Sequence, residues 1–236
     1  MVAASLNNED QLPLRLMFQD EARFGRMSDP RSCWAPAPHR PVVNLALIRE
    51  FRYEYAAVSP WDGCLDFMTA EKMNTDNMTN FLLQVSEAHK GEFIVMVVDG
   101  ASSHRSKELR VPDNVSLIRL PPYSPELNPA EQIWNKLRRD YFANRVFDSL
   151  DAATKQAESG LTEMAANKSA MRQLTNWPWI YMKILRTYCF LWHYSFICKK
   201  SAWILIFIFV VSIKEPTIRC AQLTGHVSSR ALGFSS

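Results

Sequence analysis

Four apolar runs in the first seventy residues predict β-strands. The first run, Leu14–Phe18, leads into Gln19-Asp20-Glu21, so Asp20 is expected at a strand end. An irregular connection with four prolines follows over residues 24–41. The other three runs are Val42–Ile48, Tyr53–Val58 and Cys64–Met68. Turn residues at 59–63 separate the last two runs, and this succession predicts an antiparallel meander.

Helical spacing begins after these strands, at Asn74-Thr75-Asp76. The apolar positions that define this helix are Met78, Phe81, Leu82, Val85 and Ala88. Phe93–Val98 is an uninterrupted apolar run, which is typical of a strand buried on both faces. A further strand is predicted over Val115–Leu120, and two amphipathic helices over 129–142 and 149–166. The order indicates an α/β fold with a mixed sheet flanked by helices, in which five of these six runs form the strands.

Two acidic residues are placed by this order at one edge of the sheet. A helix that crosses between parallel strands does so with a fixed hand, so Phe93–Val98 is expected beside Leu14–Phe18. The carboxyl ends of parallel neighbours coincide, and ligands bind at that edge in open α/β sheets. Asp20 and Asp99 follow these two strands. We therefore expect their side chains to lie close together.

A third acidic residue follows a rigid loop. The segment 120–139, LPPYSPELNPAEQIWNKLRR, has prolines at 121, 122, 125 and 129, and each fixes its own φ angle. Asn128 is expected as the N-cap of a helix, with Pro129 at the first position and Glu131 at the third. The loop could bring Glu131 over the same sheet edge. The alternative is a capping box, in which Glu131 bonds back to the cap N–H.

Three carboxylates at one edge fit a divalent metal centre. Phosphodiester cleavage needs an activated nucleophile and a stabilised leaving oxygen, and two Mg²⁺ ions supply both. Magnesium prefers hard oxygen ligands and needs no histidine or cysteine. Asp20, Asp99 and Glu131 are the candidate ligands and catalytic residues. Each also has an ordinary interpretation: a solvated strand end, a turn and a helix cap, respectively.

Five further residues are candidates for contacts with nucleic acid. His104 and Arg105 follow Asp99 in a loop, where a surface role is the alternative. Lys136, Arg138 and Arg139 follow Glu131 on the same helix and could track a phosphate backbone. A solvated helix face explains these three equally well.

Charge and cysteine usage separate the tail from the rest of the chain. The 236 residues carry a net charge of +3, but residues 1–180 hold 20 basic against 23 acidic residues, and 181–236 hold 7 against 1. The five cysteines are scattered, with no Cys-x-x-Cys pair and no zinc-finger spacing, which favours a reducing compartment. No secretory signal begins the chain, so we expect a cytoplasmic protein.

Domain boundaries follow from these shifts. We expect a lead-in over 1–11, a catalytic domain over 12–180 and an atypical apolar and basic extension over 181–236. Its apolar run Ala202–Ile213 is shorter than the roughly 20 residues that span a bilayer. We interpret the tail as sequence read past the natural end of the domain. A membrane anchor is the alternative, and no membrane contact is otherwise expected.

Three segments in fixed order carry a resemblance to a known family. FQDEARFG, VVDGASSH and LPPYSPELNPAEQIWNKL resemble the DDE transposases of bacterial insertion sequences in the Tc/mariner superfamily. The similarity covers about residues 12–180. Matched position by position, Asp20, Asp99 and Glu131 fall on the catalytic triad of that family, with 31 residues between the last two.

The resemblance implies a ribonuclease-H-like fold, cleavage and transfer of DNA strands, two Mg²⁺ or Mn²⁺ ions, DNA as partner and a possible homodimer. Full-length members begin with helix-turn-helix domains that recognise transposon ends. This chain begins close to the first catalytic strand, so specific end recognition is not expected of it. The alternative function is an inactive truncated remnant, or a DNA-associated protein without catalysis.

Overall fold

A computed structural model describes residues 12–99, 108–121, 124–178 and 180. The elements in chain order are β1 (Leu14–Met27), β2 (Leu47–Val58), β3 (Leu65–Ala70), α1 (Thr75–Ala88), β4 (Phe93–Val98), β5 (Val115–Arg119), η3 (Pro125–Leu127), α2 (Glu131–Leu137), η4 (Arg138–Phe142), α3 (Leu150–Ala166) and α4 (Lys168–Thr175).

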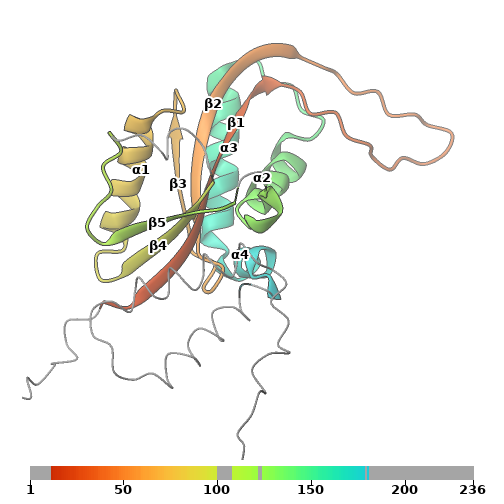
Figure 1. Cartoon of the computed structure of the whole chain (residues 1–236). Coiled ribbons are helices and arrows are strands. Elements are labelled where there is room, and N and C mark those ends of the chain that lie inside the picture. The colour runs from red at the N-terminus through yellow and green to blue at the C-terminus, as the bar shows by residue number, and fades with distance from the viewer. Residues whose placement is uncertain (1–11, 100–107, 122–123, 179, 181–236) are drawn as a thin grey trace, which may run out of the picture.

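The five strands form one mixed sheet in the order β3-β2-β1-β4-β5 (Figure 1). β1 pairs with β2 and β2 with β3 in antiparallel fashion, whereas β4 is parallel to β1 and β5 is parallel to β4. Helix α1 makes the crossover from the edge strand β3 to β4. The order and directions confirm the ribonuclease-H-like sheet expected from the sequence.

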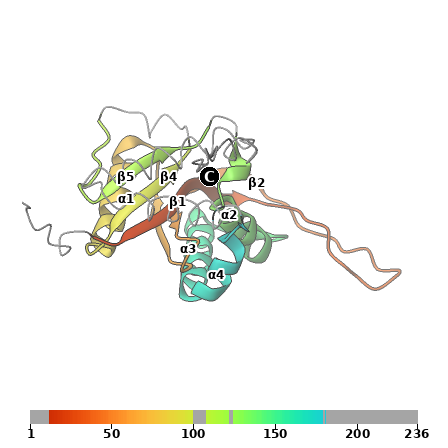
Figure 2. The same cartoon turned by 60° about the horizontal axis from the view of Figure 1, so that its bottom comes forward.

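Helices cover both faces of this sheet. α1 lies on one face, where its Phe81 and Leu82 pack with Met17 and Tyr55. α2 and α3 cover the other face, and Trp134 belongs to the core on that side (Figures 1 and 2). The central strand β1 contributes to both cores because its successive side chains point to opposite faces. The sheet is therefore buried on two sides at its centre.

Strand boundaries differ from the expectation in the first third of the chain. β1 continues nine residues beyond Phe18 to Met27, because Ala22 and Phe24 alternate with exposed Arg23 and pair with β2. Asp20 thus lies inside a strand and not at its end. The strand expected at Val42–Ile48 is wrong: residues 42–46 are irregular, and β2 begins at Leu47.

Residues 28–46, which we call the arm, connect β1 to β2 and extend away from the body in both views (Figures 1 and 2). Its base is fixed to the segment after η4. The backbone N–H of Arg31 donates to Asn144 Oδ1 at 2.8 Å, and the hydroxyl of Ser28 donates to the carbonyl of Arg145 at 3.2 Å. The arm is therefore anchored at its base and exposed along its length.

Helices on the second face also depart from the expected bounds. α2 begins at Glu131, two residues later than predicted, and its last turn widens into the π-helical segment η4. α3 agrees with the prediction and begins after Ser149, whose side chain caps the N–H of Ala152. α4 is only eight residues long and was not predicted from the sequence.

The tail expected over 181–236 lies outside the described residues. Within the described part, no helix is long and apolar enough to cross a bilayer.

Gly63 tests how the β2–β3 turn packs. It has a φ of +71°, and a Cβ there would lie 1.9 Å from the carbonyl oxygen of Lys168 in α4. Gly63→Ala is therefore expected to lower the free energy of unfolding by roughly 2 kcal/mol or more, measured by urea denaturation. Gly91→Ala is the control, because nothing lies within 4 Å of the added methyl group. Equal stability of the two variants would contradict this packing.

Candidate active site

Asp20 lies on the central strand β1 and is 7% exposed. The indole Nε1–H of Trp134 in α2 donates to its Oδ2 at 2.9 Å. Trp134 is itself buried, so this hydrogen bond joins the sheet to α2 in a water-poor environment. The carboxyl group is consequently held in one orientation on the α2 face of the sheet.

Asp99 directly follows β4, the parallel neighbour of β1. Phe18 and Val97 are the last paired residues of the two strands, and both belong to the core on the α2 face. Asp20 and Asp99 each lie two residues further along. They therefore occupy equivalent positions just beyond the paired residues of two adjacent parallel strands. Asp99 is half-buried.

Glu131 begins α2 at the end of the proline loop. Asn128 fixes this end of the loop: its Nδ2 donates to the carbonyl of Gln19 at 3.0 Å, and its Oδ1 accepts from the N–H of Ala130 at 3.1 Å. Asn128 is thus not the cap of α2, whose N-cap is Ala130 without a side-chain bond. The N–H of Asn128 donates to Pro125, which removes the partner that a capping box would give Glu131.

The electrostatics of Asp20 link it to Glu131. The pKa of Asp20 is raised to about 8, chiefly by burial and then by the negative charges of Glu131 and Glu21, against the hydrogen bond from Trp134. The Glu131 carboxylate is therefore near enough to Asp20 for its charge to disfavour ionisation of Asp20. Two of the three predicted acids therefore influence each other directly, and the third follows the strand that is paired with the strand of Asp20.

This donor set suits a hard divalent cation. In the described part of the chain, no basic side chain contributes to the pKa shift of Asp20. A cation at the site would favour the charged carboxylate and lower the raised pKa of Asp20. The three acids are not within 4.8 Å of one another as a single group among the described residues. Ligands shared between two ions about 3.5–4 Å apart can be more widely spaced.

The five predicted nucleic-acid contacts have different surroundings. His104 and Arg105 lie outside the described residues. The ammonium of Lys136 donates to Asp140 at 2.6 Å, and Arg139 donates to the same carboxylate at 2.7 Å. Hydrogen bonds and charge from Arg139 and Lys136 lower the pKa of Asp140 to about 2. Arg138 stacks over the ring of Phe24 at 5.1 Å.

Sequence reasoning missed the positioning roles of Asn128 and Trp134. From the sequence, Asn128 is expected only as a helix cap, and Trp134 only as part of the helix over 129–142. Their partners, Gln19 and Asp20, lie more than 100 residues away in the chain. The available signal was an Asn-Pro dipeptide followed by a tryptophan six residues after Asn128, which no local rule connects to β1.

Asp20→Asn is expected to stabilise the metal-free protein at pH 8. The pKa of Asp20 rises from 3.8 to about 8 on folding, so the folded protein holds this proton more tightly than the unfolded chain does. The protonated carboxyl therefore contributes its full stability below pH 4, and this contribution is lost as the pH rises through 8. The neutral amide should raise the free energy of unfolding at pH 8 on the order of 2 kcal/mol, measured by urea denaturation.

The control is Glu54→Gln. Glu54 is buried in β2, its pKa is raised to about 7 chiefly by burial, and Thr69 donates to it. Glu54→Gln should also make the free energy of unfolding less dependent on pH. Mg²⁺ should still stabilise Glu54→Gln as much as it stabilises the wild type, whereas it should not stabilise Asp20→Asn. Equal Mg²⁺ stabilisation in both variants would exclude Asp20 as a ligand.

Comparison with known proteins identifies the family. The family model described as DDE superfamily endonuclease matches residues 15–154. Uncharacterized protein y4pE/y4sA of Sinorhizobium fredii (strain NBRC 101917 / NGR234) is 32% identical over 133 residues, which cover 56% of this chain and 91% of that protein.

Solved structures with a similar chain path include a Mos1 strand transfer complex and the HTLV-2 integrase catalytic core domain in complex with magnesium. The Mos1 match has 13% identity and a TM-score of 0.46, and covers 69% of this chain and 55% of the other. The integrase match has 10% identity and a TM-score of 0.40, and covers 66% and 85%. This chain thus spans about half the length of the Mos1 chain. The family match extends over more than half of the 236 residues, and the chain belongs to the DDE superfamily endonucleases.

Proposed function

We propose that this chain is the catalytic domain of a DDE transposase, which cleaves DNA strands and joins them to new positions. The observation that carries the proposal is that Asp20 lies on β1 and Asp99 directly follows its parallel neighbour β4, with the charge of Glu131 acting on Asp20. Membership of the endonuclease family and the order of the three acids support the same reaction class.

Asp20, Asp99 and Glu131 would hold two divalent ions, Mg²⁺ or Mn²⁺. Such ions would supply an activated nucleophilic water or hydroxyl and would neutralise charge on the leaving oxygen. The chain supplies the positioning. Trp134 orients the Asp20 carboxylate by its hydrogen bond, and the buried strand around Asp20 limits access of bulk water.

Asn128 would perform a related task for Glu131. By bonding to the carbonyl of Gln19, it ties the proline loop to the residue next to Asp20. The first turn of α2 is then held against β1 from two points, Asn128 and Trp134, and Glu131 lies between them in the chain. A site held in this way needs little rearrangement when the ions bind.

DNA is the proposed substrate and partner. Of the three basic residues after Glu131, Arg139 is the best placed for a phosphate, because its side chain is 62% exposed. Its present partner Asp140 is also at the surface, and such exposed ion pairs cost little to exchange. Binding through Arg139 and Lys136 should weaken as salt concentration rises.

A second copy of the chain is the other proposed partner. The arm exposes Trp34 completely, Val42 for most of its surface and Leu45 for more than half. Large apolar side chains gathered on one projecting segment are typical of interaction sites. Sedimentation of the full chain tests this point, and a monomer at all concentrations would contradict it.

Asp99→Asn tests catalysis directly. The variant keeps the size of the side chain but removes the charge that would bind the ions, so Mg²⁺-dependent nicking of supercoiled plasmid DNA should fall at least about a hundredfold. Asp151→Asn is the matched control, because it removes the same charge at an exposed position in the first turn of α3. Equal nicking by the wild type and Asp99→Asn would contradict the proposed reaction and favour an inactive remnant.

A further inference from the structure

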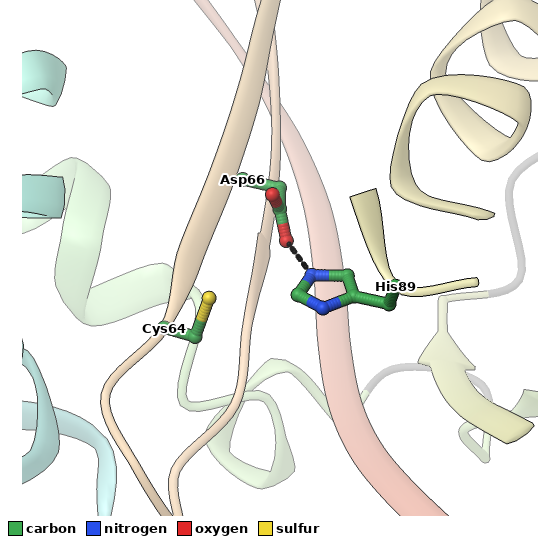
Figure 3. A group of neighbouring side chains, drawn as sticks. All are labelled: Cys64, Asp66 and His89. Carbon is green, nitrogen blue, oxygen red and sulfur yellow. Dashed lines mark hydrogen bonds and ion pairs between the residues drawn. The ribbon is translucent and has the colours of Figure 1, made fainter. Parts of the chain in front are cut away.

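A second group of metal-ligating side chains lies on the opposite face of the sheet from Glu131. Cys64 directly precedes the edge strand β3, Asp66 belongs to β3, and His89 is the C-cap of α1. Asp66 pairs with Ala57, whose side chain is in the core on the α1 face. Figure 3 shows the three side chains converging between β3 and the end of α1.

The three side chains form a compact and sheltered group. One ligand atom from each lies within 4.8 Å of the others, and this is the only such triple of His, Cys, Asp or Glu in the described residues. His89 Nε2 is 2.8 Å from Asp66 Oδ2, and these side chains are only 11% and 17% exposed. Cys64 is partly buried. Bulk water therefore has limited access to the group.

The chemistry of these ligands differs from that of the proposed active site. A thiolate, an imidazole and a carboxylate suit a borderline-soft ion such as Zn²⁺, whereas Mg²⁺ prefers oxygen ligands alone. Tetrahedral zinc sites place neighbouring ligand atoms about 3.5 Å apart. The ligand atoms of Cys64, Asp66 and His89 lie within 4.8 Å of one another, which is close to that spacing, and the fourth position would be left for water.

The surroundings resemble the outer shell of a zinc site. His89 Nδ1 faces Glu92 Oε2 at 3.4 Å, an arrangement that fixes the ring and leaves Nε2 for a metal. Arg15 holds Glu92 by a pair of hydrogen bonds and also donates to Asp62 at 2.9 Å. Asp62 in turn accepts from the backbone N–H of Cys64 at 3.0 Å. Arg15 thus binds both the acid that faces His89 and the acid that bonds to the backbone of Cys64.

We propose that Cys64, Asp66 and His89 bind one zinc-type transition-metal ion, which joins the start of the edge strand β3 to the end of α1. On binding, the thiol of Cys64 loses its proton to solvent. The proton between His89 Nε2 and Asp66 is exchanged through solvent to His89 Nδ1, which faces Glu92, so that Nε2 and the Asp66 carboxylate are both left to hold the ion. Ligation requires the thiolate form of Cys64, so the ion should bind more weakly as the pH falls. Without an ion, the His89–Asp66 hydrogen bond remains.

Titration of the full-length chain with Co²⁺ tests the site, since Co²⁺ occupies zinc sites and gives a thiolate-to-metal absorption band. The protein is first stripped of metal and then kept in excess Mg²⁺ to occupy the carboxylate site. We expect one equivalent of Co²⁺ to produce the band. Cys33→Ser should retain it, because Cys33 is exposed and distant in the arm. Cys64→Ser should abolish it.

Glu92→Gln tests the outer shell separately. It leaves all three ligands in place and should weaken Co²⁺ binding about 10- to 100-fold. Should Cys64→Ser fail to fold, as judged by circular dichroism, Asp66→Asn replaces it, with an expected weakening of at least tenfold. Absence of the band in the wild type, or an unchanged titration in the folded ligand variant, would overturn the proposal. A band that persists in the folded ligand variant would then be assigned to the cysteines of the tail.

Discussion

The hydrogen bond from Trp134 to Asp20 is the interaction on which the proposed active site depends. It is buried, it connects residues 114 positions apart, and it fixes α2 against the central strand. Glu131 lies one helical turn before Trp134, so the orientation of its side chain follows from the same contact. Loss of this bond would leave a buried carboxyl without its main donor and would free the start of α2.

The burial of Asp20 on this face of the sheet explains why a cation would favour the site. Burial of Asp20 beside Glu131 makes the doubly charged state unfavourable in the absence of metal. Two divalent ions would offset this repulsion, because each ion attracts the carboxylates that hold it. The rigid arrangement of acids thus lowers the stability of the metal-free protein and favours the metal-bound protein. The second group, at Cys64, differs because its histidine and aspartate already satisfy each other.

Much of this fold could be predicted from the sequence, because its strands are apolar and separated by turn residues. The parallel pairing of β1 and β4, and with it the neighbourhood of Asp20 and Asp99, followed from the crossover rule. The extension of β1 to Met27 was missed because its second half alternates weakly around arginines. The roles of Trp134 and Asn128 could not be predicted, since they depend on tertiary contacts with β1.

The Cys64 group shows the same limit more clearly. Cys64 and His89 are 25 residues apart, without the short spacing that marks a zinc motif, and only the path of α1 back across the sheet brings them together.

For the basic residues after Glu131, the sequence predicts more free positive charge than the structure presents. Their sequence indicates a cationic helix face, whereas Asp140 partly neutralises it and Arg138 packs on Phe24.

The convergence of three carboxylates is the central claim, and anomalous diffraction from crystals soaked in Mn²⁺ tests it most directly. We predict manganese peaks at the edge of β1 and β4, with oxygens of Asp20, Asp99 and Glu131 at coordination distance, roughly 2.0–2.3 Å. Manganese bound elsewhere, or bound there with Glu131 turned away, would contradict it.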